Sequence, residues 1–119
     1  MIETALRTII TTQFPSFPVY VATMPQTVNM PAISIRDISD LRDGMYKKYN
    51  PIIQFTIVSN RYSESKNLGQ MIMDFLVEYK GVQDYVIDGV EVVSNVNFKK
   101  ETLEYRVIDA QVNYRLLNI

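Results

Sequence analysis

Hydrophobic residues recur along this chain with two different periods, one typical of helices and one typical of strands. Between Ile2 and Phe14 they return every three or four positions, with charged and hydroxyl side chains between them. This spacing predicts an amphipathic helix that packs one face on a core. The helix should end before Pro15, because proline disfavours helical backbone angles in the residue that precedes it.

A second helical pattern occupies the middle of the chain. Its apolar positions are Leu68, Met71, Ile72, Phe75, Leu76 and Tyr79. The segment 59–63 offers several possible N-caps before it, and Lys80-Gly81 offers a basic last turn and a stop after it. Gly69 lies inside the predicted helix, where glycine costs about 1 kcal/mol relative to alanine. We interpret this glycine as a sign that the helix lies close to a sheet there.

Three short strands are predicted before the second helix. The segments 19–21, 32–36 and 52–58 are rich in β-branched and aromatic residues, and the last two alternate apolar with polar positions. Between the second and third of them, the segment 37–50 is dense in charge. We expect it to form a long hairpin arm or loop that projects from the fold.

The C-terminal third of the chain is predicted to be β-structure. Asp88-Gly89 is a strong signal for a two-residue hairpin between strands 85–87 and 90–98. We expect Val90, Val92, Val96 and Phe98 to share one face of the second of these strands. A turn at 99–102 leads to the last strand, 104–117, whose strict alternation indicates one face on a core and one face on solvent or a partner.

These elements follow the order α-β-β-β-α-β-β. Two helices can cover one face of a mainly antiparallel sheet, so we predict an α+β fold with a two-layer sandwich. The length of 119 residues fits one domain spanning residues 1–119, with the arm at about 37–50 projecting from it. Apolar residues make up 47% and charged residues 21%, which is ordinary globular usage.

The overall charge argues against several classes of partner. With 12 basic and 13 acidic residues the net charge is -1, so the surplus of Lys and Arg that neutralises phosphates is lacking, and we expect no sequence-specific nucleic-acid binding. No run approaches the roughly 20 apolar residues of a membrane span, and the first residues do not read as a signal peptide. We therefore expect no membrane partner.

Residues able to do chemistry are scarce. The chain has no His and no Cys, so the commonest general base, thiolate ligands and disulfides are missing. Asp37, Asp40 and Asp43 could form a metal or acid/base group, but a solvated turn is the simpler interpretation, and the EF-hand spacing fails. We predict no catalytic residue, no metal site and no cofactor, and thus a protein that is not an enzyme.

The arm allows two interpretations. Tyr46 and Tyr49 beside Lys47 and Lys48 could stack on and neutralise single-stranded nucleic acid. They could equally form a protein contact, because tyrosine is enriched at interfaces and lysine is common at their rims. The acidic net charge favours the protein contact. We predict that the arm is a protein interface with Arg42, Met45, Tyr46, Lys47, Lys48 and Tyr49 as its main contributors.

The order of elements resembles that of the tail-terminator (tail-completion) proteins of long-tailed bacteriophages. The likeness is carried by the N-terminal helix, the segment Pro31-Ala32-Ile33-Ser34-Ile35, the charged arm and strand 52–58. It continues through Ser59-Asn60-Arg61-Tyr62-Ser63-Glu64-Ser65-Lys66, which opens the second helix, and through the two final strands. It thus covers essentially the whole chain, as a pattern of order and length.

This resemblance implies a structural role in the virion. Such proteins form a hexameric ring that caps the last ring of tail-tube subunits, stops tube polymerisation and presents the face that joins the head. The partners would then be further copies of the chain, the tail-tube protein and a head-completion or connector protein, assembled in the host cytoplasm. Two alternatives remain: another phage neck or head-tail connector protein, and a non-enzymatic cellular interaction module.

Overall fold

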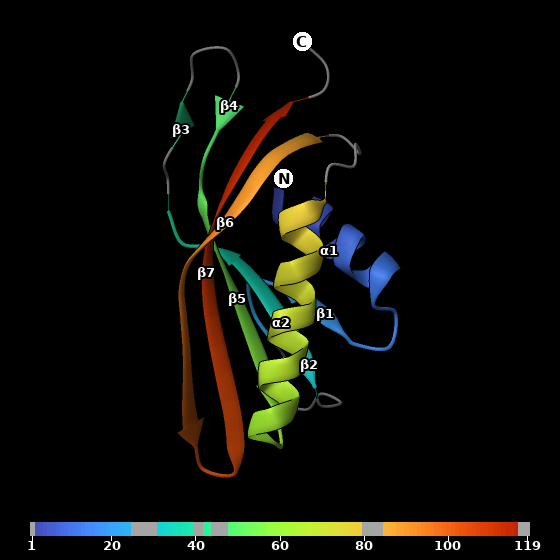
Figure 1. Cartoon of the computed structure of the whole chain (residues 1–119), viewed down its shortest axis with the longest axis vertical. Helices are drawn as coiled ribbons and strands as arrows, with labels where there is room; N and C mark the ends of the chain where they lie inside the picture. The colour runs from blue at the N-terminus through green and yellow to red at the C-terminus, as the bar shows by residue number, and fades with distance from the viewer. Residues whose placement is uncertain (1, 25–30, 40–41, 44–47, 80–84, 117–119) are drawn as a thin grey trace.

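The computed structural model of the chain describes residues 2–24, 31–39, 42–43, 48–79 and 85–116 (Figure 1). In chain order the elements are α1 (Ile2–Gln13), β1 (Val19–Val21), β2 (Ala32–Asp37), β3 (Arg42–Asp43), β4 (Lys48–Tyr49), β5 (Ile52–Ser59), α2 (Tyr62–Glu78), β6 (Tyr85–Lys100) and β7 (Leu103–Leu116). Both helices lie on one side of the sheet (Figure 1). The predicted two-layer α+β fold is confirmed, with β3 and β4 as two further short strands inside the arm.

The sheet is antiparallel except at one edge. Its order is β1-β2-β5-β7, with β6 on the far side of β7, and among the strands of the described residues only the β1–β2 pair is parallel. The 14 and 16 residues of β7 and β6 form one long hairpin. At roughly 3.3 Å per residue it spans about 50 Å. This hairpin sets the long axis of the molecule, whose extents are 47 × 24 × 24 Å.

The arm is a continuation of the sheet. Lys48 and Tyr49 of β4 pair with Arg115 and Tyr114 of β7 in the same register in which β5 pairs with the earlier part of β7. β3 then pairs with β4 as an antiparallel hairpin at the end of the molecule opposite the β6–β7 turn (Figure 1). The short strands β3 and β4 thus lie within the segment predicted to form the arm, and β4 fixes its base to β7.

The core lies between the two helices and the inner face of the sheet. Fully buried side chains come from α1 (Leu6, Ile10), β2 (Ile33, Ile35), β5 (Ile53, Phe55, Ile57), α2 (Ile72, Leu76) and β7 (Ile108, Val112). Each of them contributes about 1.5–3 kcal/mol by leaving water. The spacing in α1 and the alternation in β5 and β7 predicted these positions directly.

Helix α2 is rotated relative to the face that its sequence predicted. Met71, expected in the core, is 49% exposed, whereas Met73 is buried at 5%. Gly69 explains the rotation, because a Cβ at this position would lie 2.9 Å from Arg106 Cδ and 3.1 Å from Ile108 Cδ1 on β7. The side of α2 that carries Gly69 therefore sits directly on the sheet. The predicted close approach is confirmed.

The N-terminus of α2 lacks a side-chain cap. The capping residue is Arg61, with extended backbone angles of φ -133° and ψ 139° and no side-chain hydrogen bond to the helix. The candidate caps of the segment 59–63 are thus not used as such, and Ser59 instead donates its hydroxyl to the Arg61 carbonyl. A positive charge is also unfavourable beside the helix N-terminus.

Replacing Arg61 by aspartate is expected to stabilise the protein by about 1 kcal/mol. The backbone already has the angles that an N-cap requires, and an aspartate would accept a hydrogen bond from a free N–H of the first turn. Urea denaturation of Arg61→Asp should show a higher midpoint with an unchanged slope. Arg61→Ala is the control, since it removes the positive charge without adding a cap; an equal gain from both variants would contradict the capping explanation.

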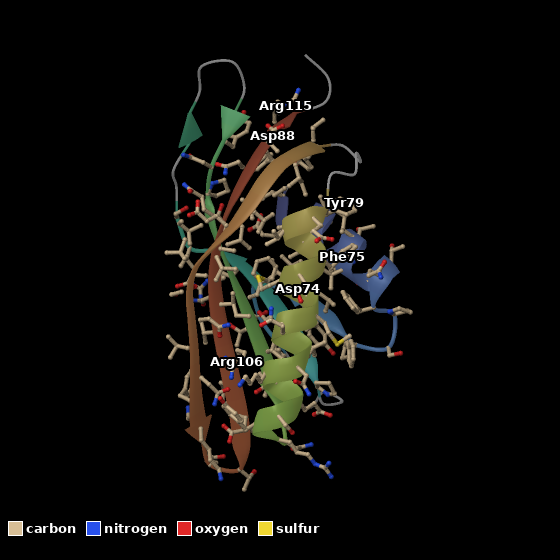
Figure 2. The ribbon with its side chains drawn as sticks, viewed as in Figure 1. Asp74, Phe75, Tyr79, Asp88, Arg106 and Arg115 are labelled. Atoms are coloured by element: carbon tan, nitrogen blue, oxygen red, sulfur yellow. The ribbon has the colours of Figure 1, made fainter. Side chains whose placement is uncertain are left out.

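The predicted hairpin at Asp88-Gly89 is wrong. β6 runs without a break from Tyr85 to Lys100 and pairs with β7 on both sides of a register shift between Ile87 and Gly89. Asp88 is the extra residue of this bulge, and its carboxylate pairs with Arg115 Nε at 3.1 Å (Figure 2). Gly89 does not have the positive φ that a type I′ turn needs. The long-range pairing with β7 overrides the local turn signal.

A second bulge changes the faces of β6. The register shifts again between Val92 and Ser94, so alternation does not continue across this point. Val90 and Val92 lie opposite Val112 and Ala110 on the helix side. Val96 and Phe98 lie opposite Val107 and Tyr105, on the other face of the sheet. The expectation that Val90, Val92, Val96 and Phe98 share one face is therefore wrong.

The turn predicted at 99–102 is confirmed as the tip of the long hairpin. Lys100 pairs with Leu103, so Glu101 and Thr102 form a two-residue loop, in which Glu101 has a φ of 59°. This backbone conformation is strained for a residue with a Cβ and is common for glycine.

Glu101→Gly is expected to stabilise the protein by about 0.5–1 kcal/mol, because it removes that strain and the gain exceeds the entropy that glycine adds to the unfolded chain. Thr102→Gly is the matched control, since Thr102 does not have a positive φ. Thermal unfolding should show a higher melting temperature for the first variant and a lower one for the second. A lower melting temperature for both would contradict this assignment of strain.

Candidate interaction surfaces

Of the residues predicted to form a contact on the arm, the structure describes Arg42, Lys48 and Tyr49, which lie at one end of the molecule. Arg42 is in β3, and Lys48 and Tyr49 are in β4, whereas Met45, Tyr46 and Lys47 lie outside the described residues. Tyr49 is half-buried and its ring stacks on that of Tyr114, with the centroids 5.1 Å apart. Tyr49 therefore anchors the base of the arm on β7, and its contact role remains a prediction.

Asp37, at the start of the arm, organises the local backbone. Asp37 Oδ1 accepts a hydrogen bond from the backbone N–H of Ser39, and the Ser39 hydroxyl accepts one from the N–H of Ile52. Asp40 lies outside the described residues. Among the residues that the structure describes, no three acidic side chains converge as a cation site would require. The carboxylate of Asp37 thus acts in the local turn.

An uncovered apolar surface lies on the outer face of the long hairpin, at the end near its turn. We call it the distal patch; it consists of Val96, Phe98, Leu103, Tyr105 and Val107. Val96 is 56% and Phe98 45% exposed. Phe98 stacks on Tyr105 with the ring centroids 5.0 Å apart and the planes 4° from parallel. The patch is therefore a preformed aromatic and aliphatic surface open to solvent.

The inner face of the same segment is polar. Arg106 Nη1 donates to Asn95 Oδ1 over 2.7 Å, the Ser65 hydroxyl donates to Asn97 Oδ1 over 3.2 Å, and Asn97 Nδ2 donates to Glu104 Oε2 over 3.2 Å. These bonds hold the polar residues under α2 and the apolar residues outside. In this segment the face toward the helices is polar and the face toward solvent is apolar. This polarity is inverted relative to an ordinary one-sided strand, whose apolar face lies on the core.

Arg106 is the centre of the inverted segment. It is 7% exposed and lies on β7 beside the N-terminal half of α2 (Figure 2). Its guanidinium carbon lies 5.5 Å from the centre of the Tyr62 ring, at a distance suitable for a cation–π contact. Its Nε is the one buried side-chain nitrogen or oxygen that lacks a hydrogen-bond partner within the described part of the chain. Arg106 thus fixes the first turns of α2 against the hairpin.

A shallow apolar groove lies on the opposite side of the molecule, along the N-terminal half of α2. It has a volume of about 350 Å³. Leu68 and Met71 of α2 line it together with Phe17 and Pro31, and Arg61, Ser63, Glu64 and Asn67 surround these apolar side chains. Leu68 is buried, whereas Met71 is half exposed. We call it the α2 groove.

Neither the distal patch nor the α2 groove was predicted from the sequence. The patch depends on the bulge between Val92 and Ser94, which turns Val96 and Phe98 outward. The adjacent pair Val92-Val93 was the available signal, because two neighbouring apolar residues interrupt alternation where a strand bulges. The groove depends on the rotation of α2 that Gly69 permits, which helical spacing alone does not reveal.

Comparison with known proteins identifies a related fold. Neither a protein-family model nor a curated protein matches the chain. Among solved structures, a chain from the virion of a native gene transfer agent (GTA) particle has the same fold, with a TM-score of 0.64. The match covers 90% of this chain and 84% of the other at 13% sequence identity.

No helix in the described part of the chain is long and apolar enough to cross a membrane.

Proposed function

We propose that this chain is a structural protein of a tailed bacteriophage or a related particle. The observation that carries this proposal is the fold shared with a chain of a gene transfer agent virion over nearly the full length of both. The order of elements along the sequence, which resembles that of phage tail-terminator proteins, supports it independently. The function would rest on binding other subunits and would involve no catalysis or cofactor.

Within this class, we propose that the chain is a tail terminator located at the neck of the virion. Copies of the chain would form a hexameric ring on the last ring of tail-tube subunits, halt tube growth and offer the other side of the ring to a head-completion or connector protein. Two surfaces on opposite sides of the molecule, the distal patch and the α2 groove, suit such an assembly. In a ring each subunit must contact two neighbours through two different surfaces.

The length of tails made without the protein tests this function. A particle-producing strain with a stop codon in this gene should assemble tubes longer than those of the parent, with heads that carry no tail. Expression of the intact chain from a plasmid should restore both normal tail length and joining. Tubes of parental length beside unjoined heads would favour the alternative role of a neck or head-tail connector protein and would contradict termination.

The arm is the proposed site of contact with the tube or the head. Arg42, Met45, Tyr46, Lys47, Lys48 and Tyr49 would contribute to it. Replacing residues 44–47 by Asn-Gly would shorten the arm, while Tyr49 would keep its stack on Tyr114. We expect a variant that still self-associates but no longer limits tail length. A shortened arm with normal tail length and normal joining would contradict this assignment.

A further inference from the structure

We infer that neighbouring subunits meet head to tail, with the distal patch of one copy seated in the α2 groove of the next. The partner of each surface is thus a second copy of this chain. The inference rests on the proposed ring and specifies which residues form its subunit contact. It does not involve the arm, which stays free to reach the tube or the head.

The inverted polarity of the hairpin points to a covered outer face. Val96 and Phe98 could face the helix layer if alternation continued from Val90, and the bulge at Val92/Ser94 turns them outward instead. Hydrogen bonds from Arg106 to Asn95 and from Ser65 to Asn97 fix that arrangement from the inside. A strand whose apolar side is held toward water fits an interface, because exposed apolar patches of this kind mark binding surfaces.

The two surfaces lie at the same level along the long axis of the molecule. Ser65 of α2 contacts Asn97 of β6, and Gly69 lies against Arg106 of β7, so the first half of α2 is level with the distal patch. One surface is on the sheet side of the sandwich and the other is on the helix side. Contact between them places neighbouring copies side by side at one height. An axial offset would instead produce an open helical filament.

Shape and charge favour the groove over a second patch as the partner. The groove is concave and presents the half-exposed Met71 beside the buried Leu68, which fits the stacked rings of Phe98 and Tyr105. Lys100 pairs with Leu103 at the edge of the patch, and the groove is lined by Glu64 beside Arg61, so the contact would bring Lys100 of one copy against Glu64 of the next.

Cysteine crosslinking tests this contact directly, because the chain has no cysteine of its own. Val96→Cys places a thiol on the patch, and Met71→Cys places one at the groove; both side chains are about half exposed, so neither change opens the core. We expect a short bismaleimide to convert the double variant into a ladder of multimers. An equimolar mixture of the two single variants should give dimers only, since each copy then carries one thiol.

The control combines Val96→Cys with Val77→Cys, which lies on α2 outside the groove and is 44% exposed. The Val96/Met71 pair should crosslink about tenfold more than this control, because contact raises the local concentration of the two thiols. Efficient dimers of Val96→Cys alone would indicate a symmetric contact and overturn the proposal.

Light scattering of the uncrosslinked wild-type chain separates failure of the contact from failure of the ring. Oligomers without selective crosslinking would overturn the patch–groove contact and leave the proposed ring standing. A wild-type chain that stays monomeric up to about 1 mM would also overturn the contact. The tail-length experiment would then decide the proposed function on its own, since it does not depend on which surface joins the subunits.

Discussion

Replacing Val96 by aspartate is expected to weaken self-association of the chain about 100-fold while the subunit stays folded. Val96 lies opposite Val107 and is the most exposed residue of the distal patch. Because its side chain is not part of the core, the substitution opens no cavity. In the assembled contact, however, the carboxylate would lose water among apolar side chains. A cost of about 3 kcal/mol for that desolvation corresponds to the 100-fold loss.

The matched control is Val77→Asp, the same substitution at a similarly exposed position on α2 outside the groove. Sedimentation velocity over a concentration series should show the weaker association for Val96→Asp alone. Circular dichroism and thermal unfolding should show both variants folded. Association of both variants at the wild-type level would contradict the role of the distal patch. An equal loss in both variants would mean that the contact covers a wider surface than the one proposed.

Gly69→Val is expected to reduce the free energy of unfolding by about 3 kcal/mol. Even the first carbon of a side chain here would lie 2.9 Å from Arg106 Cδ and 3.1 Å from Ile108 Cδ1. Valine adds two further methyl groups at a place where both neighbours are buried, so α2 must move away from the sheet. Overpacking of this kind costs 1–3 kcal/mol or more, which exceeds the roughly 0.5 kcal/mol that helix propensity gains when glycine is replaced by valine.

Gly89→Val is the matched control for this substitution. Within the part of the chain that the structure describes, Gly89 has no neighbouring atom within 4 Å of an added Cβ, and it lies in a strand, where valine is favourable. We expect its free energy of unfolding in urea to change by less than about 0.5 kcal/mol. If Gly69→Val were as stable as Gly89→Val, the close contact between α2 and β7 would be contradicted, and with it the position assigned to the groove.

Where the spacing of hydrophobic residues is uninterrupted, the ends of the helix or strand were predicted from the sequence almost to the residue. α1 was expected from Ile2 to Phe14 and ends at Gln13, and the alternation that predicted strand 52–58 appears in β5 from Ile52 to Ser59. In each of these segments the side chains that alternate or recur are those that enter the core. Local spacing and tertiary packing therefore agree, so spacing alone was sufficient.

Elements interrupted by a bulge were predicted less well. Asp88-Gly89 is a turn signal in isolation, but the paired strand β7 continues past it, and the pairing of β6 with all 14 residues of β7 outweighs the preference of two residues. The faces of β6 could not be assigned for the same reason, because a bulge is a property of two strands together. A one-residue shift moves every later side chain to the other face of the sheet.

Of the candidate surfaces, likewise, one was predicted from the sequence and two were not. The arm was visible in the sequence as a dense run of charge and tyrosine between two strands, and its position at the end of the molecule follows from its pairing with β7. The distal patch and the α2 groove were not visible, because they depend on which of several apolar residues the fold leaves uncovered. Met71 is an example: its spacing fits the core, and the rotation of α2 leaves it half exposed.

A cryo-EM reconstruction of the intact particle at the junction of head and tail tests the central claim most directly. It should show a ring of this chain on the head-proximal end of the tail tube, with Val96 and Phe98 of each copy against Leu68 and Met71 of the next. Density for the chain at the free tip of the tail, inside the capsid, or as isolated copies that do not touch one another would contradict the proposed role.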